Sequence, residues 1–354
     1  MNSYAGQGSG GFSLIEFMVS VLLGSILIAG AVGIYVGSQR AFREGEDVAM
    51  LADSARFSLS ILEDSLRHAG FFGPAGAGDI VQDGDLSAVG DDCVAPGMER
   101  ARAYNAQAYL FGVEVASGAT TALAGCLEDT VAGTDVLVIK HLAPTPAYDA
   151  DPADPAQPRD GVISFPAALA ATETYAIVNA EGGLLFDGAD AAPSVLAGET
   201  YADGVAYPYR FNIYYVHQER DEEDAAVGEP RLARRILEWD AGAGRMTIRT
   251  QELAIGVENM QFLYGLDDDL DGEPDQYSNG ELFGPNDWER VVAVRAYLLL
   301  RSRPPGEEFD AGYTDNRTYL LGDETVTPAD DRRRVLLRTE VTLRNPRLVM
   351  RGEA

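Results

Sequence analysis

FSLIEFMVSVLLGSILIAGAVGIYV, residues Phe12–Val36, is the stretch that decides how this chain is organised. Apolar and small residues fill it, and its one charged side chain is Glu16. As an α-helix it spans about 37 Å, which exceeds the hydrocarbon core of a bilayer at roughly 30 Å. The stretch therefore predicts a membrane-spanning helix, and a short polar segment, MNSYAGQGSGG (residues 1–11), precedes it.

Two common kinds of N-terminal segment do not account for this stretch. A secretory signal peptide has a basic start and a shorter apolar region, whereas residues 1–11 contain no Lys or Arg. A plain signal anchor fits the length but leaves Glu16 unexplained. A carboxylate inside a bilayer costs several kcal/mol and usually marks a function.

The segment GFSLIE, residues 11–16, resembles the cleavage and methylation motif of type IV prepilins. The resemblance implies that a prepilin peptidase cuts after Gly11 and methylates the new N-terminal residue, Phe12. It also implies that Glu16 pairs with the N-terminus of a neighbouring subunit and sets the axial register during assembly. The ammonium of the new N-terminus and the Glu16 carboxylate are each costly in lipid without a partner, which explains why such a pair forms.

The leader departs from the family's pattern because prepilin leaders usually contain Lys or Arg. The first basic residues are Arg40 and Arg43, on the side of the helix that should face outward. This arrangement runs against the positive-inside tendency.

The helix is expected to continue beyond the membrane. Apolar residues recur every three or four positions through residues 38–68, as in a helix packed on a domain: Phe42, Val48, Leu51, Ala55, Leu59, Leu62 and Leu66. Gly70 is expected to end it. The expected organisation is a leader (1–11), a membrane and assembly helix (12–36), an amphipathic half of the same helix (37–70) and an extracytoplasmic head (71–354).

Three further segments resemble the PilW-type minor pilins, which are related to the J-type minor pseudopilins of type II secretion. They are residues 54–73, residues 257–265 and residues 334–345. The family's usual cysteine after the first segment is replaced by Pro74.

The resemblance implies a minor pilin of the complex that primes a type IV pilus, lies at its tip and helps to present an adhesin. The implied partners are the prepilin peptidase, other minor pilins, the major pilin and a PilY-type tip adhesin. The implied location is the bacterial inner membrane, with the head in the periplasm, and then the pilus fibre or tip. The alternatives are a minor pseudopilin of type II secretion and a calcium-dependent adhesive pilin.

Charge and cysteine content limit the function further. The 354 residues have a formal net charge of −29, which argues against nucleic acid as a partner. The two cysteines, Cys93 and Cys126, lie in the expected extracytoplasmic part, where one disulfide is the expected state and two buried thiols are the alternative.

The head is expected to be rich in β-structure, giving an α+β fold in which one long helix packs on the head. Strand-like runs of β-branched and aromatic residues occur at 136–139, 210–216, 234–239, 261–264 and 291–300. Residues 143–160, rich in proline and aspartate, and the acidic residues 217–230 are expected to be loops.

The loop DDDLDGEPD, residues 267–275, has the carboxylate spacing of a calcium-binding loop, with glycine at its sixth position. The side chains of Asp267, Asp269, Asp271 and Asp275 and the carbonyl of Glu273 are the candidate ligands. Position twelve is Ser278 and not the bidentate glutamate of an EF-hand. A solvated acidic turn is the alternative.

We expect no enzymatic activity. No nucleophile elbow or phosphate-binding glycine loop follows a strand, and His68, His141 and His217 are expected to lie far apart.

Overall fold

The computed structural model describes residues 13–147, 169–195, 197–223, 225–284, 286–304 and 313–345. The predicted cleavage residues Gly11 and Phe12 lie outside these ranges, as does most of the predicted loop 143–160.

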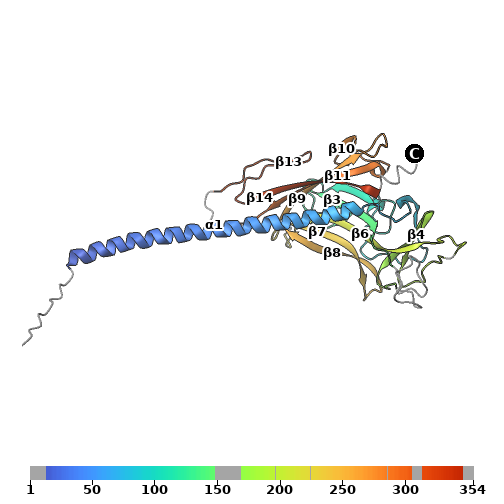
Figure 1. Ribbon diagram of the computed structural model, residues 1–354, viewed down its shortest axis with the longest axis horizontal. Coiled ribbons are helices and arrows are strands. Elements are labelled where there is room, and N and C mark those ends of the chain that lie inside the picture. The colour runs from blue at the N-terminus through green and yellow to red at the C-terminus, as the bar shows by residue number, and fades with distance from the viewer. Residues whose placement is uncertain are drawn as a thin grey trace, which may run out of the picture.

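One long helix, α1 (Leu14–His68), projects far beyond the rest of the molecule (Figure 1). By length and composition it is the one helix in the described ranges that could cross a membrane. It ends at His68 with Ala69 as its C-cap, and Gly70 follows with a φ of +71°. A side chain at Gly70 would also meet the ring of Tyr109, so glycine suits this position for two reasons.

The second half of α1 packs on the head, but later than the apolar pattern predicts. Leu51, Ala55, Leu62 and Leu66 are buried. Phe42 is 64% exposed and Val48 is 44% exposed, so the predicted packing of these two side chains is wrong. The described part of the head does not extend far enough along the helix to bury them, because buried contact begins at Leu51.

Within the described ranges, the head contains strands and four short 3-10 helices. The longer strands are β2 (Leu110–Glu114), β3 (Asp135–Leu142), β4 (Thr174–Asn179), β5 (Gly182–Asp187), β6 (Val205–His217), β7 (Arg231–Asp240), β8 (Arg245–Ile255), β9 (Val257–Leu266), β11 (Val291–Arg301) and β14 (Arg334–Thr342). The short strands are β1 (Ile80–Gln82), β10 (Gln276–Ser278), β12 (Tyr319–Leu321) and β13 (Glu324–Val326). The 3-10 helices are η1 (Ala77–Asp79), η2 (Glu99–Ala101), η3 (Leu123–Gly125) and η4 (Trp288–Arg290).

These strands form two main sheets and a small hairpin. The first sheet has the order β1-β5-β4-β6-β3-β2, and β7 and β8 branch from it at β6. The second has the order β10-β9-β11-β14, and β12 pairs with β13. All pairs are antiparallel except β1 with β5. The predicted α+β fold, one long helix on a β-rich head, is therefore confirmed.

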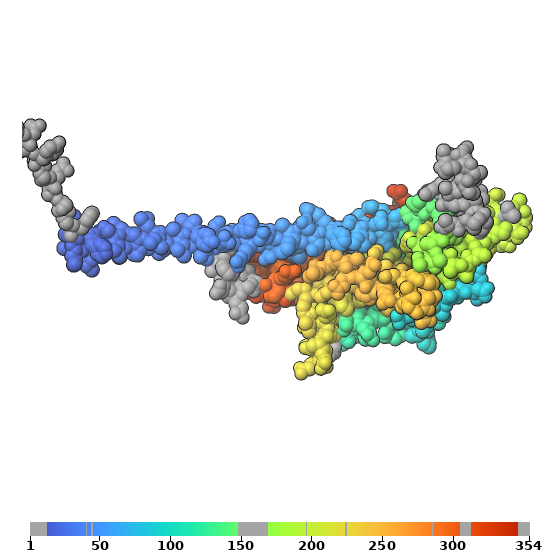
Figure 2. Space-filling model, turned by 90° about the horizontal axis from the view of Figure 1, so that it is seen from below, coloured from blue at the N-terminus to red at the C-terminus, as the bar shows by residue number. Residues whose placement is uncertain are grey.

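The main core lies between the second half of α1 and both sheets. It contains Leu62 and Leu66 from α1, Ile213 from β6 and Leu298 from β11, all with 0% exposure. In Figure 2 the head lies on one side of the helix. The helix and both sheets therefore bury their apolar faces together, which stabilises the junction by the hydrophobic effect.

Polar contacts fix the end of α1 at several points along the head. Glu63 accepts a hydrogen bond from the Thr339 hydroxyl of β14 at 2.6 Å. The Ala69 carbonyl accepts one from the Asn345 side chain at 3.1 Å, and the Gly70 amide donates to the Lys140 carbonyl at 3.3 Å. Both sheets thus hold the last turns of the helix.

A disulfide joins Cys93 and Cys126, with 5.3 Å between their Cα atoms, as predicted. Arg235 of β7 donates hydrogen bonds to the carbonyl of Cys126 and, at 3.3 Å, to the carbonyl of Asp91. The disulfide and Arg235 together tie two long connections to the first sheet.

Candidate functional site

The N-terminus of α1 forms a reciprocal cap around Glu16. Ser13 has an extended backbone, and its hydroxyl accepts a hydrogen bond from the Glu16 amide at 3.2 Å. The Glu16 carboxylate in turn accepts one from the Ser13 amide at 2.9 Å. This capping box satisfies two amides that a helix leaves without partners.

The cap holds the Glu16 carboxylate at the first turn, four residues after the predicted new N-terminus, Phe12. A negative charge is stabilised there by the positive end of the helix dipole. Around it, α1 exposes a continuous apolar surface that includes Leu14, Phe17, Leu22 and Ile26. This exposed apolar surface is chemically suited to lipid or to contact with other apolar helices.

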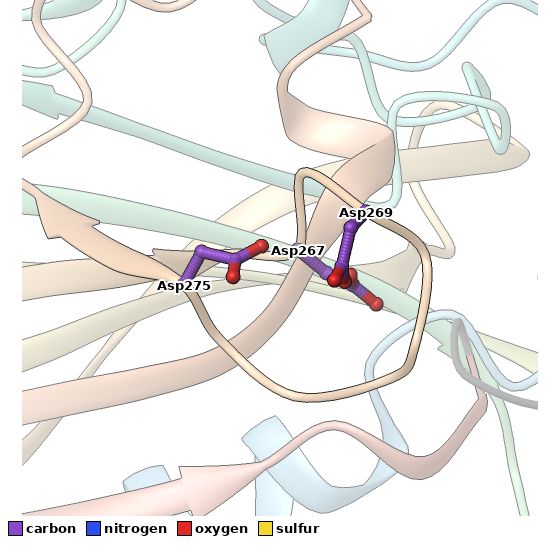
Figure 3. Close-up of side chains that lie close together, drawn as sticks. All are labelled: Asp267, Asp269 and Asp275. Atoms are coloured by element: carbon purple, nitrogen blue, oxygen red, sulfur yellow. The ribbon is translucent and has the colours of Figure 1, made fainter.

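The second candidate site is the acidic loop between β9 and β10 (Figure 3). Carboxylate oxygens of Asp267, Asp269 and Asp275 lie within 4.8 Å of one another. Asp267 is fully buried, whereas Asp269 and Asp275 are exposed. The sequence pattern is thus folded so that three of its four predicted side-chain ligands converge, while Asp271 is not part of this group.

Hydrogen bonds within the loop hold the carboxylates in this arrangement. Asp267 accepts from the amides of Gly272 at 2.7 Å and Asp271 at 3.1 Å. Asp275 accepts from the Asp268 amide at 2.8 Å. Gly272 has a φ of +86°, which permits the turn that the calcium-loop pattern requires.

Negative charge is crowded at the exposed end of the loop. A hydrogen bond from the Asp271 amide acts to lower the pKa of Asp269. Desolvation by the surrounding loop and the carboxylates of Asp271, Asp275 and Asp267 outweigh it, so the pKa is raised. Arg290 forms an ion pair with Asp268 at 2.8 Å, outside the converging group. The three converging carboxylates are chemically suited to a hard divalent cation.

The structure corrects one prediction about histidines. His68 and His141 do not lie far apart, because their rings stack with centroids 5.5 Å apart where α1 meets β3. Burial lowers the pKa of His141 to about 4. The contact could not be read from spacing in the sequence, since it depends on how the end of α1 docks on β3.

Two family models match this chain, one near its N-terminus and one in its C-terminal part. A family model described as type IV pilus-assembly protein W (PilW) matches residues 213–345, from β6 to the end of the described chain. A model described as the prokaryotic N-terminal methylation motif matches residues 7–32, which contain Gly11, Phe12 and Glu16. The predicted PilW-like segment at 54–73 lies outside both matches.

Among solved structures, a type IV-like pilin from Thermus thermophilus is similar, with 14% sequence identity, coverage of 83% of this chain and 97% of that chain, and a TM-score of 0.29. Comparison with curated proteins finds no match.

The apolar helix with its methylation motif, followed by a β-rich head, has the features of a type IV pilin-like protein. Within that class, residues 213–345 are similar to PilW-type proteins. The motif implies processing by a prepilin peptidase and partners from a type IV pilus in general, and it is consistent with anchoring in the inner membrane. Proteins of this class are structural.

Proposed function

We propose that this protein is a minor pilin of the complex that primes a type IV pilus and lies at its tip. The observation that supports it is the PilW match over residues 213–345, which contain the end of β6, β7, β8 and the whole second sheet. This part of the head is joined to a helix whose first half is free of the head. Other minor pilins and the major pilin would pack on that free half. The head would remain outside, where it helps to present a PilY-type adhesin.

Glu16 supplies the assembly chemistry in this proposal. After cleavage, a methylated ammonium at Phe12 and the Glu16 carboxylate are the two charges that must be neutralised in lipid. The Ser13 cap keeps the carboxylate at the helix end, where the ammonium of a neighbouring subunit can reach it.

Paired substitutions in the full chain test this role. Glu16→Gln keeps the shape of the side chain and removes its charge, so we expect normal processing and loss of surface pili. Glu46→Gln, an exposed carboxylate of α1 beyond the predicted span, serves as the control and should leave pili unchanged. Gly11→Leu should leave an uncleaved precursor. Normal pili with Glu16→Gln would contradict the proposal.

Deletion of the gene separates the pilus from type II secretion. We expect loss of surface pili and normal levels of secreted proteins. Normal piliation with a secretion defect would show that the protein is a pseudopilin.

We also propose that the loop at residues 267–275 binds Ca²⁺ through Asp267, Asp269 and Asp275, with Asp271 and the Glu273 carbonyl as further donors. The convergence of three carboxylates, one of them fully buried, supports it. Calcium would relieve the crowding of charge and order the surface beside β10. This site would also suit a calcium-dependent adhesive pilin.

Thermal unfolding with and without calcium tests this site. Millimolar CaCl₂ should raise the Tm of the wild type, and Asp269→Ala with Asp271→Ala should abolish the rise. Glu222→Ala with Glu223→Ala removes the same charge from an exposed loop and should preserve it. An equal rise in both double variants would indicate nonspecific screening.

A further inference from the structure

Strand β6 has a gap in the pairing along one of its edges. Its residues Tyr209–Tyr214 pair with β3 and its residues Asn212–His217 pair with β7, so β3 and β7 lie on opposite edges. The chain after β3 stays on its edge, since the Ala143 amide donates to the Pro208 carbonyl. β4 pairs with Val205–Pro208 of β6. It therefore lies on the same edge of β6 as β7.

Between β4 and β7 the sheet divides. Residues 209–211 of β6 pair with no strand of the described chain on this edge. Figure 1 shows β4 and the β7–β8 pair leaving β6 in different directions. β7 continues for four residues, Leu237–Asp240, that pair only with β8. We call this place the β6 fork.

The continuation of β7 presents an open strand edge. Backbone groups of successive strand residues point to alternate sides, so half of those in Leu237–Asp240 face away from β8. Among the described residues, no other strand pairs with this edge. Unpaired edges of this kind are templates for another strand.

A groove of about 490 Å³ occupies the β6 fork. Its lining includes Glu173 and Thr174 before and in β4, Arg210 in β6, Ile236 and Trp239 in β7, and Met246 in β8. Four residues of strand extend about 13 Å, so a short extended segment matches the open edge in length.

The two faces of the open edge differ in chemistry. On one face Leu237 lies opposite Ile248 and Trp239 lies opposite Met246, so that face is apolar. On the other face Glu238 is exposed, and no ion pair to it is found in the described part of the chain. Arg210 is already paired with Glu173 at 3.6 Å.

We propose that the β6 fork binds an extended segment of another protein chain, which adds a strand to β7 along Leu237–Asp240. The segment would have apolar residues at every second position, against Leu237 and Trp239, and a Lys or Arg opposite Glu238. The negative charge of the head favours the same basic partner. This inference does not depend on the pilus role or on calcium.

Hydrogen exchange on the full chain in detergent micelles tests the proposal. The probe is a five-residue peptide, Val-Lys-Val-Lys-Val with blocked ends, at millimolar concentration. We expect the open-edge amides of residues 237–240 to exchange at least tenfold more slowly when it is bound. The same peptide with N-methylated backbone amides cannot donate hydrogen bonds and should give no protection.

Charge reversal provides the matched control. Glu238→Lys should abolish protection by the lysine peptide and create it with Val-Asp-Val-Asp-Val, whereas Glu222→Lys, on an exposed loop, should change neither. The proposal is overturned if the lysine peptide gives no slowing, if the N-methylated peptide acts equally, or if Glu238→Lys has no effect. Protection of all these amides in the free chain would also overturn it, because the edge would already be occupied.

Discussion

Asp135, at the start of β3, is a carboxyl group buried inside an acidic protein. Burial raises its pKa to about 8, opposed by a hydrogen bond from the Phe262 amide at 2.7 Å, and the carboxylates of Glu114, Asp323 and Glu281 raise it further. The folded chain therefore holds a proton that the unfolded chain releases near pH 4.

The substitution Asp135→Asn tests whether Asp135 is protonated in the folded chain. Because the folded pKa lies above the unfolded one, the contribution of Asp135 to stability is present below pH 4 and is lost as the pH rises to about 8. Asn is neutral and can still accept from Phe262. We expect the variant to be more stable than the wild type at pH 8 and equal to it near pH 4, measured by denaturant unfolding. If the free energy of unfolding of the variant and the wild type changed with pH in parallel, this prediction would be contradicted.

His141 should make stability depend on pH in the opposite direction to Asp135. Burial lowers its pKa to about 4, the Leu142 carbonyl opposes this shift, and His68 and Arg210 add to it. The folded state therefore disfavours the charged ring, and stability falls as the pH drops from about 6.5 to about 4. His141→Gln should remove this fall, measured as Tm against pH, and an unchanged fall would assign it to other groups.

At the scale of single residues, the sequence predicts features whose chemistry is local. A carboxylate inside an apolar run predicts a functional role for Glu16, which stays a prediction. The expected extracytoplasmic location predicts that Cys93 and Cys126 form a disulfide, and the structure contains it. Asp135, His141 and Lys140, the chain's single lysine, could not be recognised. Lys140 is fully buried and donates to the carbonyls of Arg100 and Asn105, a setting that only the folded chain creates.

At the scale of elements, α1 divides into a free half and a docked half. The apolar period predicted the docked face but not where docking starts, since Val48 continues the pattern and is exposed. Similarly, the strand patterns located β3, β6, β7, β9 and β11, but the branching of the sheet at β6 depends on pairing between distant segments. Short strands such as β1 have too few residues to show a period.

A pair of substitutions locates the start of docking. Leu62→Ala opens a cavity in the core and should lower the free energy of unfolding by about 2–5 kcal/mol. Val48→Ala lies on the same predicted stripe and should change it by less than about 0.5 kcal/mol. Denaturant unfolding in detergent measures both. If both variants lowered the free energy of unfolding by comparable amounts, the contact between α1 and the head would extend to Val48.

At the scale of the whole molecule, the disulfide connects segments that local structure does not hold. It closes a separation of 33 residues, and in the chain-entropy model such a loop contributes about 3–4 kcal/mol. Replacing both cysteines with serine should lower the Tm by several degrees while Arg235 still contacts the main chain. Reduction of the wild type should reproduce the variant's Tm, and a Tm unaffected by reduction would show that Arg235 and packing suffice.

The contacts of α1 with the head also have a mechanical consequence. Glu63, Ala69 and Gly70 are held by bonds from β14, the chain after it and β3, and the buried apolar side chains lie along the same axis. Tension entering through the free half of the helix would load these contacts together in shear. They would not peel apart one at a time from an end. A head attached in this way resists extraction from its own stalk, so force applied to the outer surface passes through both sheets into the helix.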